Sequence, residues 1–271
     1  YGRTGPYADK GGFDLVAQGM SGLMSITGES KDKPPMKVGA PITDITAGLL
    51  AASGILAALV HRNKTGEGQK VDTSLFEAGI VHTYWQSAIA GATGQSPGPL
   101  GSAHPLTAPY QAFKTMDKWI TVGASNQNTW LMLLKAINRM DLQENEMFSS
   151  NFNRKKNITQ LVEILNAELI KKTSDEWLKI FDDNGLPCGP INSINEMFED
   201  PQTIEREMII KVDNKKAGSS KAIGMPIKFS KSKTEKSKGA PNLGEHTKEI
   251  MKIFDYNDEQ IEDFYNRKVI L

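Results

Sequence analysis

The chain has 271 residues, and its 32 basic and 32 acidic side chains give a formal net charge of zero, which argues against nucleic acid as a partner because phosphate binding requires a basic face. Hydrophobic residues make up 39% and charged residues 24%, a mixture typical of a folded protein and not of a disordered one. The single cysteine excludes an internal disulfide framework and a cysteine-based zinc cluster.

The chain begins at Tyr1, and no basic segment followed by an apolar one marks a signal peptide. Because the first residue is not Met, we expect either a processed protein or part of a longer one. The expected compartment is the cytoplasm, or the mitochondrion if a leader was lost together with the residues before Tyr1.

Residues 46–60 (TAGLLAASGILAALV) form the most apolar stretch of the chain. Fifteen residues fall short of the roughly 20 that a membrane-spanning helix needs. We therefore expect a buried helix and no membrane partner. Asp44 precedes this stretch at the expected N-cap, a position that favours Asp.

After a glycine turn, residues 69–74 are predicted to form a short strand, and residues 76–90 a second apolar helix. Residues 91–109 are rich in Gly, Pro and Ser and indicate a domain boundary. Residues 110–113 and 119–122 flank a polar turn, which predicts a β-hairpin.

A helical pattern covers residues 126–181, and prolines break it at residues 185–190. Residues 194–208 are predicted to be a helix, and residues 208–230 strands around a polar turn. The lysine-rich run 230–238 is expected to be a solvated loop. Two final helices are predicted at 243–254 and 258–266. Helices and strands together indicate an α/β or α+β protein.

Several common catalytic motifs are absent from the sequence. It contains no GxxxxGK[ST] phosphate loop, GxSxG elbow, HExxH or CxxC motif. The four histidines lie too far apart to suggest a metal site, so none is expected. Cys188 has no companion base nearby in sequence and is expected to be packed rather than reactive.

Asp44 is the residue best placed for chemistry. A carboxylate at the start of a helix is stabilised as an anion by the helix dipole and by free backbone N–H groups. Such a carboxylate can attack an acyl carbon and form a covalent intermediate. The alternative is a plain N-cap, which the residue pattern alone favours.

A series of motifs follows from one end of the chain to the other. The longest is residues 38–59 (VGAPITDITAGLLAASGILAAL), which holds Asp44. The others are residues 5–7, 12–18, 61–62, 64–69, 109–113, 185–192 and 243–247. Together they resemble the class III CoA-transferases, the formyl-CoA and carnitine CoA-transferase type. Residues 101–115 resemble most closely the succinate–hydroxymethylglutarate (glutarate) branch.

The resemblance implies an enzyme that moves CoA from an acyl-CoA, such as succinyl-CoA, to a small carboxylic acid. Asp44 matches the catalytic aspartate, which forms a mixed anhydride and then an aspartyl-CoA thioester. CoA and acyl-CoA are substrates, and no permanently bound cofactor is implied.

The resemblance also implies binding residues for the substrates. Positions that line the path of CoA are matched by Lys10, Gly11, Gly12 and Phe13. Asp14 matches a second acidic position beside them, although it could instead cap the helix that it precedes. The glycine-rich active-site loop of the family is matched at Gly101, Ser102 and His104, where the alternative is a plain turn between domains.

The fold implied by the resemblance is α/β. It has an incomplete, nucleotide-binding-like large domain at residues 1–105, a small α+β domain at 106–200, and a segment at 201–271 that returns to the large domain. An interlocked homodimer is expected. The start of the family's large domain precedes the equivalent of Tyr1, so we expect this chain to lack it.

Two other functions remain open at this point. One is a 2-methylacyl-CoA racemase, which uses a His–Asp pair where this chain has Phe13 and Asp14; phenylalanine cannot exchange a proton. The other is a non-catalytic subunit that binds acyl-CoA, which the expected loss of the N-terminal part favours and the presence of Asp44 disfavours.

Overall fold

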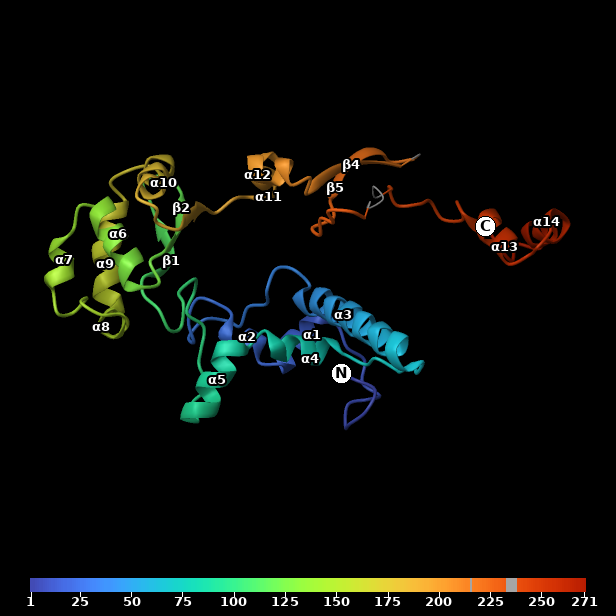
Figure 1. The fold of residues 1–271 in the computed structure, drawn as a ribbon, viewed down its shortest axis with the longest axis horizontal. Helices are drawn as coiled ribbons and strands as arrows, with labels where there is room; N and C mark the ends of the chain where they lie inside the picture. Colours follow the sequence, from blue (N-terminus) through green and yellow to red (C-terminus); the bar gives the residue numbers. More distant parts are fainter. Residues whose placement is uncertain (215, 233–237) are drawn as a thin grey trace. The chain divides into compact units, whose positions relative to one another are not determined.

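A computed structural model describes residues 1–214, 216–232 and 238–271. The chain falls into two compact units, Tyr1–Ile191 and Asn192–Leu271, and each is described by itself (Figure 1). Most of the lysine-rich run 230–238 lies outside the described residues, so its expected solvated loop stays a prediction.

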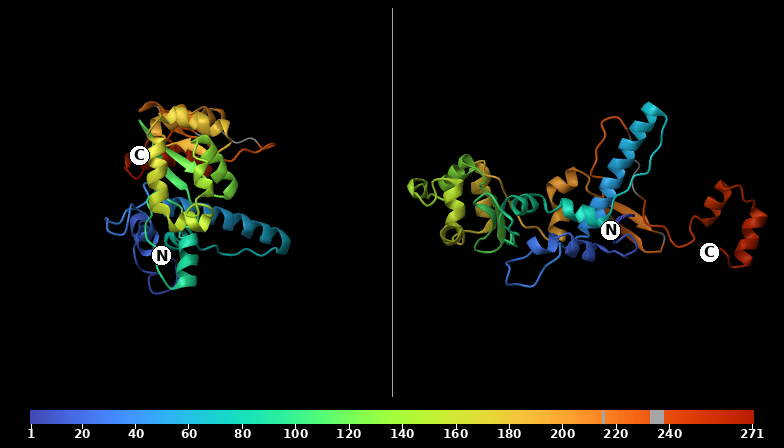
Figure 2. Two further views of the ribbon diagram at one scale, coloured as in Figure 1. Left: turned by 90° about the vertical axis from the view of Figure 1, so that its left-hand side faces the viewer. Right: turned by 90° about the horizontal axis from the view of Figure 1, so that it is seen from below.

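The first unit begins with helices only. Their bounds are α1 (Asp14–Met20), α2 (Leu23–Ile26), α3 (Ile42–Thr65), α4 (Leu75–Val81) and α5 (Tyr84–Thr93). Helix α3 packs against α1 and α4, and Figure 2 shows it as one unbroken rod. Thr46 on α3 and His82 at the end of α4 join the two helices through a hydrogen bond of 2.7 Å between Oγ1 and Nε2.

The expectation that the apolar stretch forms a buried helix is wrong for this chain. Thr43 is the buried residue of α3, whereas Leu49 and Leu56 are each 64% exposed. The helix contacts neighbours along only part of its surface. With 24 residues it is also longer than the periodicity indicated, and by length and composition alone it could cross a membrane. Those two properties do not distinguish a membrane span from a helix that packs against protein.

Two further expectations in this region need correction. Residues 69–74 form neither a strand nor a helix and belong to no sheet among the described residues, so the predicted strand is wrong. The predicted helix at 76–90 is two helices, α4 and α5, separated at His82 and Thr83. The Thr83 hydroxyl donates to the carbonyl of Ile80, which competes with helix continuation.

The second half of this unit is a small α+β core. Its strands are β1 (Tyr110–Lys114), β2 (Trp119–Gly123) and β3 (Cys188–Pro190), antiparallel in the order β1-β2-β3. The hairpin prediction is confirmed, and β3 is a strand that the proline-rich sequence concealed. The helices are α6 (Gln127–Ala136), α7 (Asp141–Glu144), α8 (Asn151–Lys156), α9 (Ile158–Leu169) and α10 (Ser174–Asp183).

Periodicity explains how this core forms. Ile120 and Val122 alternate with exposed residues on β2, so one face of the sheet is apolar. Leu161, Leu165 and Leu169 recur every four residues on α9 and are fully buried. These faces pack together in one hydrophobic cluster.

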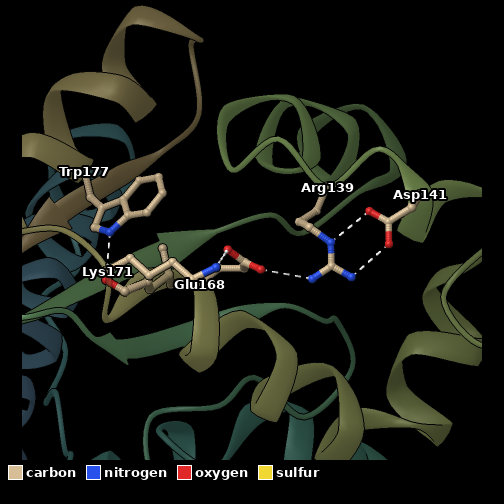
Figure 3. A network of polar contacts seen from close by, with 6 residues as sticks. Arg139, Asp141, Glu168, Lys171 and Trp177 are labelled. Atoms are coloured by element: carbon tan, nitrogen blue, oxygen red, sulfur yellow. Dashed lines mark hydrogen bonds and ion pairs between the residues drawn. The ribbon is translucent and has the colours of Figure 1, made fainter.

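An ion-pair network supports the helices around this core (Figure 3). The guanidinium of Arg139 donates to both oxygens of Asp141 at 2.8 Å and to Glu168 at 3.1 Å. Lys171 donates to the other oxygen of Glu168 at 2.6 Å. Through Arg139 the network connects the start of α7 to the end of α9.

The second unit contains short helices and one hairpin. Its elements are α11 (Ile194–Glu199), α12 (Pro201–Glu205), β4 (Ile209–Asn214), β5 (Gly218–Ile223), α13 (Thr247–Ile253) and α14 (Asp258–Asn266). The predicted helix at 194–208 is interrupted at Asp200, because a proline disfavours helical backbone at the residue before it. The strands and the two final helices are confirmed.

The expected mixed fold of helices and strands is confirmed. The structure divides the chain at residues 191 and 192 by compactness. The three-part division at residues 105 and 200 stays a prediction.

Candidate active site

Asp44 lies in the first turn of α3 with its side chain exposed. No hydrogen bond or ion pair joins its carboxylate to another residue that the structure describes. The helix begins at Ile42 with Pro41 as N-cap, so the expectation that Asp44 is the N-cap is wrong. The helix starts before the run 46–60 because Ile42, Thr43 and Asp44 already belong to its first turn. A carboxylate in this turn is still stabilised as an anion by the helix dipole.

The start of α3 is capped from another helix. Asp14 Oδ1 accepts hydrogen bonds from the Thr43 amide at 3.1 Å and from the Thr43 hydroxyl at 2.8 Å. Pro41 has no polar side chain with which to satisfy these donors. The alternative that Asp14 caps its own helix is wrong, because Phe13 is the N-cap of α1 and makes no side-chain cap.

Gln18 completes this arrangement from the next turn of α1. Its amide nitrogen donates to Asp14 Oδ2 at 2.8 Å, and its amide oxygen accepts from the Val38 amide at 2.9 Å. Both Gln18 and Thr43 are 0% exposed. Burial acts to raise the pKa of Asp14, but the hydrogen bonds from Thr43 and Gln18 and the charge of Lys37 outweigh it, so this pKa lies below its ordinary value.

The residues expected to line the path of CoA precede Asp14 directly. The ammonium of Lys10 lies 4.1 Å from the centre of the Tyr7 ring. Phe13 is 79% exposed, and Gly11 has open space beside it. A Cβ on Gly12 would lie 3.7 Å from the Tyr1 ring, which is ordinary contact. This segment is therefore an accessible surface that leads to the start of α1.

The loop expected to match the family's glycine-rich segment lies against β1. The Gly101 amide donates to the Gly28 carbonyl at 2.9 Å, and Gly101 has a φ of +60°, which favours glycine. The Ser102 hydroxyl accepts from the Ala112 amide at 3.0 Å. A cavity of about 530 Å³ opens here, with Ser102, Tyr110 and Cys188 among its lining residues.

His104 is held in one orientation. Its Nδ1 accepts hydrogen bonds from the amides of Leu106 and Thr107, at 3.1 and 3.2 Å. Its ring lies edge-on between Trp85 and Tyr110. Burial, followed by the charge of Lys155, lowers the pKa of His104. The imidazole is therefore neutral near pH 7, with its proton on Nε2.

The predicted residues thus form two groups. Asp14 contacts the turn that carries Asp44, and Lys10 to Phe13 lead into Asp14. Ser102 and His104 contact β1 and the residues directly before it. Among the described residues, no hydrogen bond, ion pair or ring contact joins the loop at Gly101 to the turn at Asp44.

Other candidates for chemistry are weaker. Burial, together with the neighbouring Asp182 carboxylate, raises the pKa of the Cys188 thiol to about 11, which suits a packed residue and not a nucleophile. No group of three His, Cys, Asp or Glu side chains in the described part of the chain could hold a metal ion.

Sequence analysis does not single out Thr43 or Gln18. The spacing of Asp14 and Gln18, four residues apart on a helix, places both on one face and could have indicated their contact. Thr43 is 29 residues from Asp14, and nothing in the sequence connects the two.

Residues 1–247 match the profile described as CoA-transferase family III. The chain is 38% identical to an acyl-CoA transferase of Fusarium pseudograminearum over 100% of its length, and 34% identical to the succinyl-CoA:glutarate CoA-transferase of Mus musculus over 97%. It covers 59% and 60% of those two proteins, so it spans about 60% of the length of the curated relatives it matches.

The fold also resembles that of a solved structure. The crystal structure of a CAIB/BAIF family protein from Brucella suis superposes with a TM-score of 0.78 at 33% sequence identity. The match covers 93% of this chain and 65% of that one.

Proposed function

The chain belongs to CoA-transferase family III, and on this basis we propose that it transfers CoA from an acyl-CoA to a small carboxylic acid through Asp44. Succinyl-CoA is the proposed donor, and dicarboxylic acids such as glutarate are the proposed acceptors. The succinyl-CoA:glutarate transferase activity in the name of the mouse relative supports this substrate class.

The observation that carries the assignment is the contrast between two neighbouring acids. The Asp14 carboxylate accepts three hydrogen bonds, two from Thr43 and one from Gln18. Three of the roughly four acceptor sites of this carboxylate are occupied, which makes Asp14 the poorer nucleophile. The Asp44 carboxylate is exposed and has no partner among the described residues. Of the two acids at this helix start, Asp44 is the one free to attack.

The proposed reaction takes up and releases no proton, because every attacking and leaving group is a carboxylate or a thiolate. A carboxylate oxygen of Asp44 attacks the thioester carbon of the donor, the C–S bond breaks, and CoA leaves as a thiolate. The thiolate then attacks the Asp44 carbonyl of the mixed anhydride. The C–O bond to the donor acid breaks, the donor leaves as a carboxylate, and an Asp44–CoA thioester remains.

The second half of the reaction reverses these steps with the acceptor. The acceptor carboxylate attacks the Asp44 thioester carbon and releases the CoA thiolate, giving a second anhydride. The thiolate attacks the acyl carbon of the acceptor, which forms the new acyl-CoA and returns Asp44 as a free carboxylate. The helix dipole of α3 favours the anionic form of Asp44 at the start and at the end of the cycle.

The two groups of predicted binding residues are proposed to contact different portions of the acyl-CoA. The open surface from Lys10 to Phe13 leads to Asp14 and suits the arm of CoA, with the Lys10 ammonium as the cation for its phosphates. Gly101, Ser102 and the Nε2–H of His104 are proposed to contact the acyl group. The homodimer also remains a proposal, which analytical ultracentrifugation tests.

Trapping of the covalent intermediate tests the proposed function. The protein is incubated with succinyl-CoA and then with hydroxylamine, and its peptides are mapped by mass spectrometry. We expect a hydroxamate on the peptide that contains Asp44. Asp44→Ala should abolish the adduct and the transfer of CoA to glutarate, whereas Asp72→Ala, which removes another exposed acid, should leave both unchanged.

Two outcomes would overturn the proposal. Near-normal transfer by Asp44→Ala would show that Asp44 is not the nucleophile. Binding of CoA with no adduct and no transfer would favour the non-catalytic subunit. Phe13 supports transfer over racemisation because it cannot carry a proton, and racemisation of a 2-methylacyl-CoA without an acceptor acid would contradict that preference.

A further inference from the structure

The start of α3 is held by a chain of polar contacts that links three segments. Thr43 belongs to α3, Asp14 and Gln18 belong to α1, and Val38 belongs to the loop between α2 and α3. Asp14 accepts from Thr43 and Gln18, and Gln18 in turn accepts from the Val38 amide. Each contact lies between 2.8 and 3.1 Å.

Burial makes this chain of contacts cooperative. Thr43 and Gln18 are both 0% exposed, and Asp14, the acceptor between them, is partly exposed. A buried donor left without an acceptor is strongly unfavourable. Loss of one side chain therefore weakens the contacts of the others, as expected for a buried polar network.

Asp44 follows Thr43 directly in the same helical turn. No hydrogen bond or ion pair holds its own side chain to another residue that the structure describes. Pro41, the N-cap, contributes no side-chain hydrogen bond. The backbone at Thr43 therefore sets the place from which the Asp44 carboxylate projects.

We propose that Thr43 and Gln18 are positioning residues, which fix the first turn of α3 through Asp14 and so hold the Asp44 carboxylate for attack. This inference rests on the proposed function of Asp44. Neither residue touches the reacting atoms. Their effect is on the fraction of time that the nucleophile spends in a productive geometry, which enters kcat more than KM.

Thr43→Val removes the hydroxyl donor and preserves the shape of the side chain, and Thr43→Ser restores the donor. Thr46→Val is the matched control. Thr46 lies on the same helix, is partly buried and anchors α3 to His82 through one side-chain hydrogen bond, but this bond points to α4. The two valine variants thus lose the same kind of contact at different places.

The measurement is the single-turnover rate of Asp44–CoA thioester formation from succinyl-CoA, together with KM and the unfolding temperature. We expect Thr43→Val to lower the rate about tenfold or more, since small displacements of a reacting group have effects of this size. KM should change less than about twofold, and Thr43→Ser should return the rate close to that of the wild type. Thr46→Val should lower the unfolding temperature to a similar extent and leave the rate unchanged.

An equal loss of rate in Thr43→Val and Thr46→Val would overturn the inference, as would an unchanged rate in Thr43→Val. If Thr43→Val does not fold, the same measurements on Gln18→Met test the proposal. This substitution removes the contacts to Asp14 and Val38 and should lower the rate with KM unchanged; a folded Gln18→Met with the wild-type rate contradicts the proposal. Failure of the proposed function is distinct, because the wild type would then form no Asp44 adduct at all.

Discussion

The Asp14 carboxylate binds the amide and the hydroxyl of Thr43 through a single oxygen, at 3.1 and 2.8 Å, across 29 residues of sequence. One helix thereby caps another. The second oxygen of Asp14 accepts a hydrogen bond from Gln18, so both oxygens of the carboxylate have a partner. The acid next to Thr43 in sequence, Asp44, is left free.

This cap predicts a loss of stability in Asp14→Ala. The substitution leaves the buried Thr43 and Gln18 donors without an acceptor, and one unpaired buried donor costs about 1–3 kcal/mol. Urea unfolding monitored by circular dichroism measures the change. Asp9→Ala removes a nearby exposed acid and should have little effect. Equal stability of Asp14→Ala and the wild type would contradict the cap.

A second prediction concerns acid stability. The Ser174 amide is the largest influence on Asp117; burial opposes it, and Thr115, the Ser174 hydroxyl and the Lys118 amide reinforce it, so the pKa falls to about 2 from an ordinary 3.8. Because the folded pKa is the lower one, this stabilisation is complete above about pH 4 and is lost as the pH falls toward 2.

Asp117→Asn should therefore be less stable than the wild type at pH 7, and the difference should shrink between pH 4 and pH 2. Unfolding free energies measured across this range test it. Asp175→Asn, at an exposed residue on the neighbouring helix α10, is the control and should change the stability at pH 7 less than Asp117→Asn. A difference that grows toward pH 2 would show that the sign is wrong.

The core of the small α+β part predicts a large effect of one truncation. Leu165 is 0% exposed on α9 and packs within the hydrophobic cluster. Leu165→Ala should destabilise the fold by about 2–5 kcal/mol, because it removes buried apolar surface and leaves a cavity. Ile170→Ala, at a residue 44% exposed, should have a much smaller effect. Chemical denaturation compares the two variants.

The ion pairs in Figure 3 predict a smaller effect. Glu168 accepts from both Arg139 and Lys171, and its side chain is 17% exposed. Glu168→Gln should cost up to about 1 kcal/mol and become milder in high salt, because partly exposed pairs are screened. Asp183→Asn breaks the exposed pair with Lys179 and should change stability less. Thermal unfolding at low and high salt checks both.

Cys188 should resist alkylation at neutral pH. Burial and Asp182 keep its thiol protonated, and the thiolate is the reactive form. The rate of labelling by iodoacetamide should rise with pH up to about 11. Asp182→Asn should speed labelling at pH 7 because it removes the neighbouring negative charge. Fast labelling of the wild type at pH 7 would contradict this assignment.

Local patterns carried much of the fold. Alternation on β2 and the four-residue spacing of leucines on α9 are properties of the sequence itself, so the hairpin and the helices of the small α+β part could be predicted. The boundaries between α4 and α5 and between α11 and α12 were harder to predict. Local hydrogen bonding at Thr83 and backbone restriction before Pro201 override the apolar periodicity there.

Long-range contacts could not be predicted in the same way. Strand β3 depends on a partner about 70 residues away, and its sequence, Cys188–Pro190, has no strand pattern. The same holds for residues 69–74, which have a strand-like composition and no partner in the described chain. A strand exists only where a second segment supplies the hydrogen-bonding edge.

For the candidate site, the sequence by itself determined the family resemblance and, through it, the choice of Asp44, because the motif around this residue is continuous along the chain. The tertiary structure alone decided that Asp44 is not the cap, that Asp14 caps α3 from another helix, and that Thr43 and Gln18 complete the arrangement. The physical reason is that a hydrogen bond depends on distance in space, and a chain reversal that brings residues 14 and 43 together leaves no periodic signal in the residues that it joins.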